Sequence, residues 1–224
     1  MTRGGVEFNF MGKIERRLFL HGLSAGVAGG LTGLIRQALA ADAKAIGQGI
    51  RRARGEVSVN GKPAQEGTPI GPGDTISTGQ NSDAIYVLGG NAFFQRADGR
   101  VDFGNTLAAT FLRVLTGGLL SVFGKGNRQL ATSAATIGIR GTGCYIQAEE
   151  HRSYFCLCYG AVVLQPENGE TVRYETTHHE RPLWIENGAT SPASVINHTD
   201  AEIIMLEEFV GRGSPFPAGS TYYQ

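Results

Sequence analysis

Several features that would point directly to a common function are missing from this chain of 224 residues. Its formal net charge is zero and no block of Lys and Arg stands out after the first forty residues, so no nucleic-acid partner is expected. No Ser, His and Asp stand in a hydrolase motif, and no glycine-rich loop with a lysine is present to hold phosphate. No low-complexity linker or internal repeat divides the chain. These absences favour a single domain without enzymatic activity.

The N-terminus carries the features of an export signal. Arg16 and Arg17 precede a run rich in Gly, Ala and Leu, and small residues follow that run. Because Arg36 leaves the apolar run too short for a good membrane-spanning helix, we predict cleavage after Ala40. The paired arginines resemble a twin-arginine (Tat) signal, which implies export of the folded protein to the periplasm. Contact with the membrane would then be transient, through the signal peptide alone.

Glycine is abundant, at 33 residues, and it separates a series of short apolar runs. Two-residue turns between strands are expected at Asn60-Gly61, Gly89-Gly90 and Gly117-Gly118. The last of these would join strands at 111–115 and 119–123. Closely spaced strands without interleaved helices predict an all-β fold, an antiparallel roll or sandwich of short strands.

One short helix is predicted near the C-terminus. Thr199-Asp-Ala-Glu202 forms a capping box ahead of an apolar run, and glycines follow that run. The expected organisation is a signal peptide at 1–40, a polar lead at 41–54, a β-domain at 55–164 and a C-terminal extension at 165–224. The extension carries a pair of histidines and the helix.

Four glycine-containing motifs occur in order: Gly55-Glu-Val-Ser-Val-Asn-Gly61, Gly71-Pro-Gly-Asp-Thr-Ile-Ser-Thr-Gly79, Gly117-Gly-Leu-Leu-Ser-Val-Phe123 and Ala134-Ala-Thr-Ile-Gly-Ile-Arg-Gly-Thr-Gly143. In these motifs the chain resembles the periplasmic FecR domain family over residues 55–164. The resemblance implies an all-β module that regulates or binds another envelope protein or a surface component, without catalysis. Regulators of that family carry a cytoplasmic segment before a membrane span. Only about fifteen residues precede the signal here, so a free-standing domain is expected.

The three cysteines of the chain form the candidate site. Cys144, Cys156 and Cys158 fall within the run 141–160, which is expected to be a β-hairpin with its turn near His151. Cys156 and Cys158 share one face of their strand because side chains alternate along a strand. A turn centred at His151 places Cys144 opposite Cys158 on that same face. Three sulfur atoms would then converge on one patch.

Thiolate and imidazole groups suggest a metal at this patch. Zinc binds both kinds of ligand tetrahedrally, and thiolates also hold iron–sulfur clusters. Adjacent residues on a strand face opposite ways, so at most one of His178 and His179 would face the sulfur atoms. We prefer His178 as the fourth ligand, ahead of His179 and His198. The sequence therefore predicts a zinc or iron–sulfur centre held by Cys144, Cys156, Cys158 and His178.

Other interpretations of the cysteines stay open. A disulfide between Cys144 and Cys158 is natural in the periplasm, although it would leave one odd thiol. The cysteines could instead fill the core as small apolar residues. A periplasmic redox enzyme or metallo-enzyme could use the clustered thiols, with a cysteine activated by histidine as nucleophile. A structural metal in a non-enzymatic module is the hypothesis that we favour.

Overall fold

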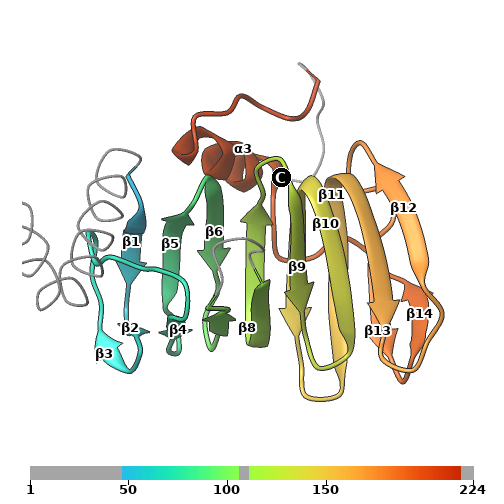
Figure 1. The fold of residues 1–224 in the computed structure, drawn as a ribbon, viewed down its shortest axis with the longest axis horizontal. Coiled ribbons are helices and arrows are strands. Elements are labelled where there is room, and N and C mark those ends of the chain that lie inside the picture. The colour runs from blue at the N-terminus through green and yellow to red at the C-terminus, as the bar shows by residue number, and fades with distance from the viewer. Residues whose placement is uncertain (1–46, 106–110, 218–224) are drawn as a thin grey trace, which may run out of the picture. The chain divides into compact units, whose positions relative to one another are not determined.

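The computed structural model describes residues 47–105 and 111–217 (Figure 1). The predicted signal peptide, residues 1–40, lies outside the described residues. Within them, no helix is both long enough and apolar enough to span a membrane.

Fourteen strands in the described part of the chain join in one open, mostly antiparallel sheet. The first strands are β1 (Gly49–Arg54), β2 (Val57–Val59), β3 (Lys62–Pro63), β4 (Thr75–Thr78), β5 (Asp83–Leu88), β6 (Asn91–Gln95) and β7 (Arg100–Phe103). They are followed by β8 (Phe111–Val122), β9 (Asn127–Ala131), β10 (Ala135–Ala148), β11 (Arg152–Pro166), β12 (Val172–Thr176), β13 (Leu183–Glu186) and β14 (Ala189–Pro192). One short helix, α3 (Asp200–Phe209), completes the described elements. The predicted all-β class is confirmed.

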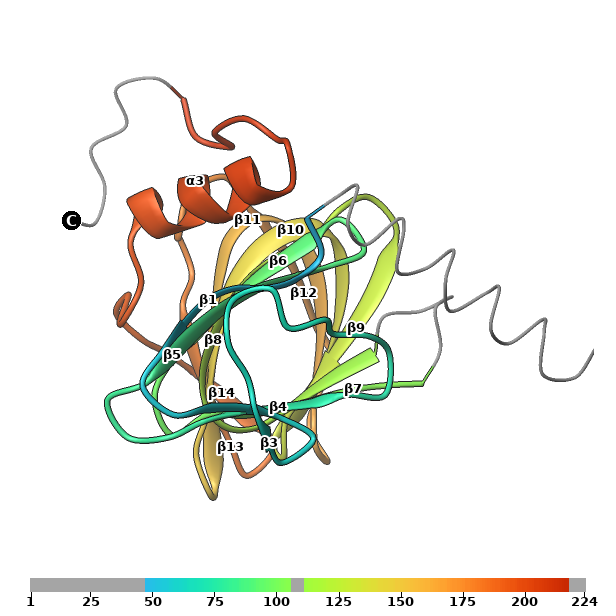
Figure 2. The same cartoon turned by 90° about the vertical axis from the view of Figure 1, so that its left-hand side faces the viewer.

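The long strand β8 gives the sheet its curvature. It pairs with β6, β7 and β10 in antiparallel fashion and with β9 in parallel fashion. The strands consequently wrap around an interior (Figure 2). Alternate side chains fill this interior with a continuous apolar core, whose fully buried members include Ile76, Tyr86, Phe93, Leu112, Leu119, Ile137, Ile146 and Phe155.

Two of the three expected two-residue turns are confirmed. Asn60 and Gly61 join β2 to β3 with φ of 54° and 73°, and Gly89 and Gly90 join β5 to β6 with φ of 57° and 72°. These left-handed angles are the ones that a tight hairpin turn requires.

The pair Gly117-Gly118 does not form a turn, so that prediction is wrong. Both glycines lie inside β8, and the strands expected on either side of them are one continuous strand. A Cβ atom on Gly117 would lie 2.6 Å from Cα of Gly99, and one on Gly118 would overlap the hydroxyl of Tyr145. Here glycine permits a close approach of neighbouring groups, which is its other common role within strands.

The helix α3 begins and ends as its sequence predicts. The Thr199 side chain accepts a hydrogen bond from the Glu202 backbone, and the Glu202 side chain accepts one from the Thr199 backbone. At the other end, Gly211 adopts a left-handed φ of 72°. Its N–H donates to the Glu208 carbonyl, and the Arg212 N–H donates to the Glu207 carbonyl. The helix packs over β6 and β8 on the outer face of the sheet (Figures 1 and 2).

The sheet extends beyond both ends of residues 55–164. Strand β1 pairs with β5, and β12 and β13 both pair with β11, with β14 next to β13. The region expected to be a C-terminal extension with a helix therefore contributes three strands to the same sheet, in addition to α3.

Candidate metal centre

The register of the β10–β11 hairpin decides where the cysteines point. The Glu149 N–H donates to the carbonyl of Arg152 at 3.0 Å, so the turn centres between Glu150 and His151. Cys144 therefore pairs with Leu157, and the predicted pairing of Cys144 with Cys158 is wrong by one residue. Because side chains alternate, a shift of one residue moves a side chain to the opposite face.

Cys144 consequently lies in the interior core, while Cys156 and Cys158 belong to a second core on the outer face. Cys158 is the extra residue of a β-bulge, since Gly143 pairs with Tyr159 and Cys144 with Leu157. Burial, and then the nearby Cys156, raises the pKa of the Cys144 thiol well above its usual range. The predicted face of three sulfur atoms does not form, and all three cysteines are free of disulfides.

Two histidines from the C-terminal part of the chain complete a cluster with the outer sulfur atoms. His179 follows β12, and its backbone N–H donates to the Cys158 carbonyl at 3.0 Å. Its φ of 51° is left-handed, an uncommon conformation for a residue other than glycine. His198 immediately precedes the helix cap and stacks on Tyr145, with 4.9 Å between ring centroids. Cys156, Cys158, His179 and His198 are all buried.

The four ligand atoms of this cluster lie within 4.8 Å of one another. The Cys156 Sγ atom is 3.4 Å from His179 Nδ1, which is 3.1 Å from His198 Nε2. Ideal tetrahedral zinc bonds imply separations of about 3.5 Å for sulfur to nitrogen and about 3.3 Å for nitrogen to nitrogen. The observed distances agree with these values to within about 0.3 Å. Two of the six separations therefore match a single tetrahedral ion, and the others lie within 4.8 Å.

In each histidine, the hydrogen bond at the nitrogen that faces away from the cluster determines whether the other nitrogen carries a lone pair. His198 Nδ1 is 2.6 Å from the Ile196 carbonyl, which can only accept, so this nitrogen carries the proton. His179 Nε2 lies 3.0 Å from Asp200 Oδ1 and likewise donates to a carboxylate. In the neutral rings, His179 Nδ1 and His198 Nε2 then present lone pairs to each other and to sulfur. This is the tautomer arrangement of metal-binding histidines.

Asp200 orients the histidine pair from the first residue of α3. Its second oxygen is 2.8 Å from His178 Nε2, and the His178 ring stacks on Phe216 at 4.4 Å. His178, which the sequence predicts as the fourth ligand, thus interacts with this carboxylate and lies outside the four-ligand cluster. The two adjacent histidines both reach the Asp200 carboxylate, with 5.2 Å between their ring centroids, and His179 is the one that contacts sulfur.

The pKa values of the two thiols in the cluster shift in opposite directions. Hydrogen bonding from the Cys158 thiol is the main cause that lowers the pKa of Cys156 to about 4. Burial, and then interaction with Cys156, raises the pKa of Cys158 well above its usual value. A divalent ion bound by two thiolates and two neutral imidazoles would bring the net charge to zero, which suits a buried site.

The sulfur atoms of the cluster are enclosed, although His198 lines a surface pocket of about 770 Å³. Cys156, His179 and Asp200 form a chain of nucleophile, base and carboxylate, but Cys156 and the His179 side chain are 0% exposed. Four protein ligands also fill a tetrahedral coordination sphere, as in structural zinc sites. The geometry favours a structural metal over a reactive thiol.

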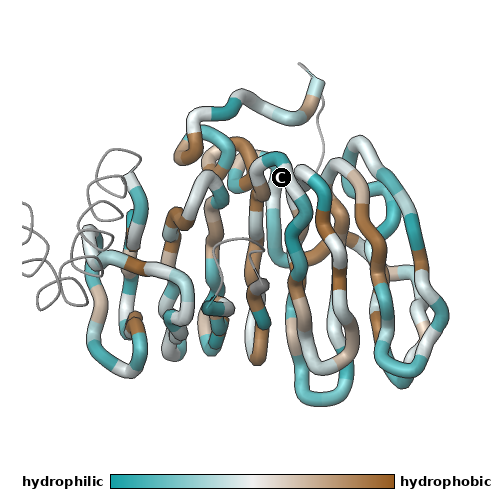
Figure 3. Tube along the Cα trace, viewed as in Figure 1, coloured by the Kyte–Doolittle hydropathy of each residue, from teal (hydrophilic) through white to brown (hydrophobic). Residues whose placement is uncertain are grey.

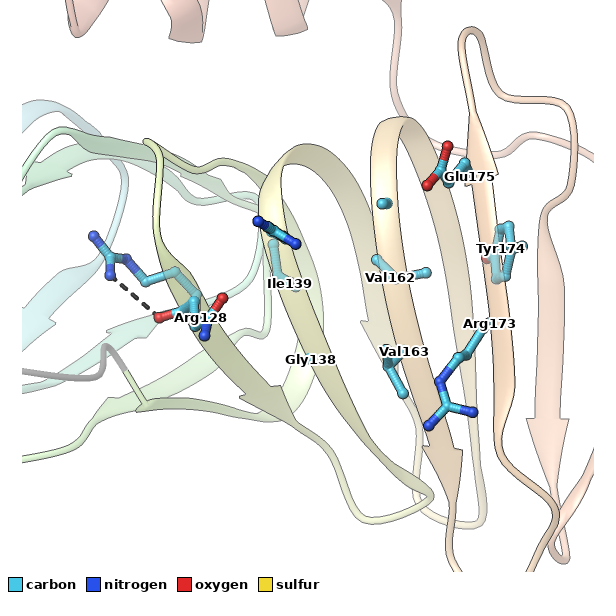
Figure 4. A pocket seen from close by; sticks show the side chains of 11 residues that line it. Arg128, Gly138, Ile139, Val162, Val163, Arg173, Tyr174 and Glu175 are labelled. Carbon is cyan, nitrogen blue, oxygen red and sulfur yellow. Dashed lines mark hydrogen bonds between the residues drawn. The ribbon is translucent and has the colours of Figure 1, made fainter.

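A separate pocket of about 510 Å³ lies on strands β9 to β12 (Figure 4). Its lining includes Arg128, Val162, Val163, Arg173 and Tyr174, and contains none of the four clustered residues. The pocket therefore gives no access to the sulfur atoms.

No protein-family model matches the chain, and no curated protein matches it. Among solved structures, the chain is similar to two crystal structures, at 2.50 Å and 1.65 Å resolution, each described as a "putative anti-sigma factor from Parabacteroides distasonis ATCC 8503". Both matches have 12% sequence identity and a TM-score of 0.47. They cover 61% and 60% of this chain, and 73% and 74% of the matched chains.

Proposed function

We propose that this protein is an exported, FecR-like β-domain of the cell envelope that binds one structural zinc ion. The ligands are Cys156, Cys158, His179 and His198. The observation that carries the proposal is the convergence of these four ligand atoms within 4.8 Å in a buried site. The ion fixes the C-terminal part of the chain to the outer face of the sheet.

The donor set favours zinc over an iron–sulfur cluster. Two sulfur and two nitrogen ligands in tetrahedral array are typical of zinc. A [2Fe–2S] centre with two cysteines and two histidines divides its ligands between two iron atoms. Here all four ligand atoms lie within 4.8 Å of one another, and the nitrogen atoms of His179 and His198 are only 3.1 Å apart.

The module acts by binding, as a regulator or scaffold, and its partner is another envelope protein or a surface component. Two features of the sequence support this proposal: the twin-arginine-like signal and the ordered glycine motifs between residues 55 and 143. The closed ligand set supports a structural role for the metal.

Elemental analysis of the purified full chain tests the zinc site, together with a thiol count after denaturation in chelator. We expect one zinc per chain and three free thiols. Cobalt substituted for zinc should give the intense absorption of tetrahedral thiolate coordination, and Cys156→Ala or Cys158→Ala should weaken it. A metal-free protein after folding in the presence of zinc, or full zinc content in a Cys156→Ala/Cys158→Ala double variant, would refute the site.

A further inference from the structure

The four ligands of the proposed zinc site come from three separate segments of the chain. Cys156 and Cys158 lie in β11, His179 lies in the loop after β12, and His198 lies in the segment 193–199 that leads into α3. An ion bound by all four cross-links this segment to the sheet. Asp200, the first residue of α3, joins the same network through His179.

The segment and helix cover an apolar surface. Ile203 and Leu206 of α3 are fully buried against the outer face. Hydrophobic positions recur along the strands under the helix and in the helix itself (Figure 3). The outer-face residues that they cover include Ile85, Val87, Phe94, Leu120 and Val122. Release of the first half of α3 would expose part of this surface to water.

The two ends of α3 are held by different contacts. At its C-terminal end, buried Glu207 accepts a hydrogen bond from Tyr159 and pairs with Arg212. Arg212 also donates to the Gly90 carbonyl at 2.9 Å. The contact between Arg212 and Gly90 involves no zinc ligand, whereas Tyr159 directly follows Cys158 in β11.

Polar contacts other than the zinc ligands also hold the segment and the N-terminal end of α3. The Ser194 carbonyl accepts from Tyr154 and the Asn197 side chain donates to Gln147, each at 2.9 Å. Arg96 pairs with Glu202 at 2.8 Å, with both side chains 25% exposed. Arg96 also donates to the Asn197 carbonyl at 2.7 Å. A helix of ten residues is marginal without tertiary contacts, so its first turns depend on how the segment 193–199 is anchored.

The histidine geometry makes this anchor depend on the ion. Outer hydrogen bonds turn His179 Nδ1 and His198 Nε2 toward each other at 3.1 Å. With both lone pairs directed inward, the contact is attractive only when a positive centre, a bound ion or a shared proton, lies between them. Without the ion, a single hydrogen bond between the two rings replaces the cross-link from His198 to both sulfur atoms and to His179.

We infer that zinc controls docking of residues 193–203 on the outer face of the sheet, while the C-terminal end of α3 stays attached. The inference rests on the proposed zinc site. When zinc is bound, the segment and the first turn of α3 are fixed. When zinc is removed, they detach and part of the apolar outer face becomes accessible.

Hydrogen exchange of the full chain, with zinc, after chelation and after zinc is restored, tests this inference. We expect peptides covering 193–203 to exchange at least about tenfold faster without zinc, and to recover when zinc is added. Peptides from β10 and from 207–212 should change little. His198→Ala should show the chelated pattern in the presence of zinc. His151→Ala, at an exposed turn position, should respond to zinc as the unmodified protein does.

Zinc content is measured on the same samples, so that the two proposals fail separately. One bound zinc per chain with unchanged exchange at 193–203 would overturn the docking inference and leave the zinc site intact. Faster exchange throughout β10 as well would also overturn it, because zinc would then stabilise the whole domain. Absence of bound zinc would overturn both.

Discussion

Alanine substitutions at Cys144 and Cys158 give opposite expectations for stabilisation by zinc. A ligand present at about a thousand times its dissociation constant stabilises the folded state by about 4 kcal/mol. In a domain of this size, each kcal/mol shifts the Tm by about 2–4 °C. Zinc should therefore raise the Tm of the unmodified protein by about 8–16 °C relative to chelator.

Cys158→Ala removes a ligand, so the Tm difference between zinc and chelator should fall to nearly zero. Cys144→Ala removes a sulfur atom from the interior core, on the other face of the sheet. The small cavity should cost about 1 kcal/mol. This lowers the Tm by about 2–4 °C both in zinc and in chelator. The zinc increment, that is, the difference in Tm between zinc and chelator, should therefore stay the same.

Calorimetry of both variants with zinc and with chelator measures the increment directly. Cys156→Ala provides a second ligand variant and should behave as Cys158→Ala does. A Cys144→Ala variant that loses the increment, beside a Cys158→Ala variant that keeps it, would refute the register argument and restore Cys144 as a ligand.

Three further predictions concern pH, packing and the helix cap. Zinc affinity should fall about tenfold for each unit by which the pH decreases near neutrality. Cys158 must lose its proton to bind zinc, whereas Cys156, with a pKa of about 4, is already ionised. Competition titrations with a chelator at several pH values test this, and an affinity that does not change with pH contradicts it. Gly118→Ala should displace Tyr145 and lower the free energy of unfolding in urea by about 1–3 kcal/mol. Gly213→Ala is the control and should not have this effect, because its added methyl group meets no atom within 4 Å. Thr199→Ala should cost about 1 kcal/mol in the same assay and Thr199→Ser far less; equal losses would exclude the capping role.

Local features of the fold could be predicted from the sequence because their causes are local. Asn60-Gly61 and Gly89-Gly90 adopt the left-handed angles of tight turns, and the capping box at Thr199 starts α3. Gly117-Gly118 has the same local signature as a turn but lies inside β8. What distinguishes it is the close approach of Gly99 and Tyr145, which are distant in the sequence.

The candidate site was predictable only in part. The alternation of side chains along one strand was sufficient to place Cys156 and Cys158 on the same face. The relation of Cys144 to them depended on a turn centred between Glu150 and His151, and an error of one residue reverses the face.

The all-β class, the short helix and the shared face of Cys156 and Cys158 follow from neighbouring residues, so the sequence alone predicts them. The burial of Cys144 in the interior core and the approach of His179 and His198 to the outer sulfur atoms depend on long-range packing. The residues involved are too far apart along the chain for a local pattern to relate them. His198 reaches Cys156 only because the segment before α3 packs on the outer face, and no local pattern encodes that packing.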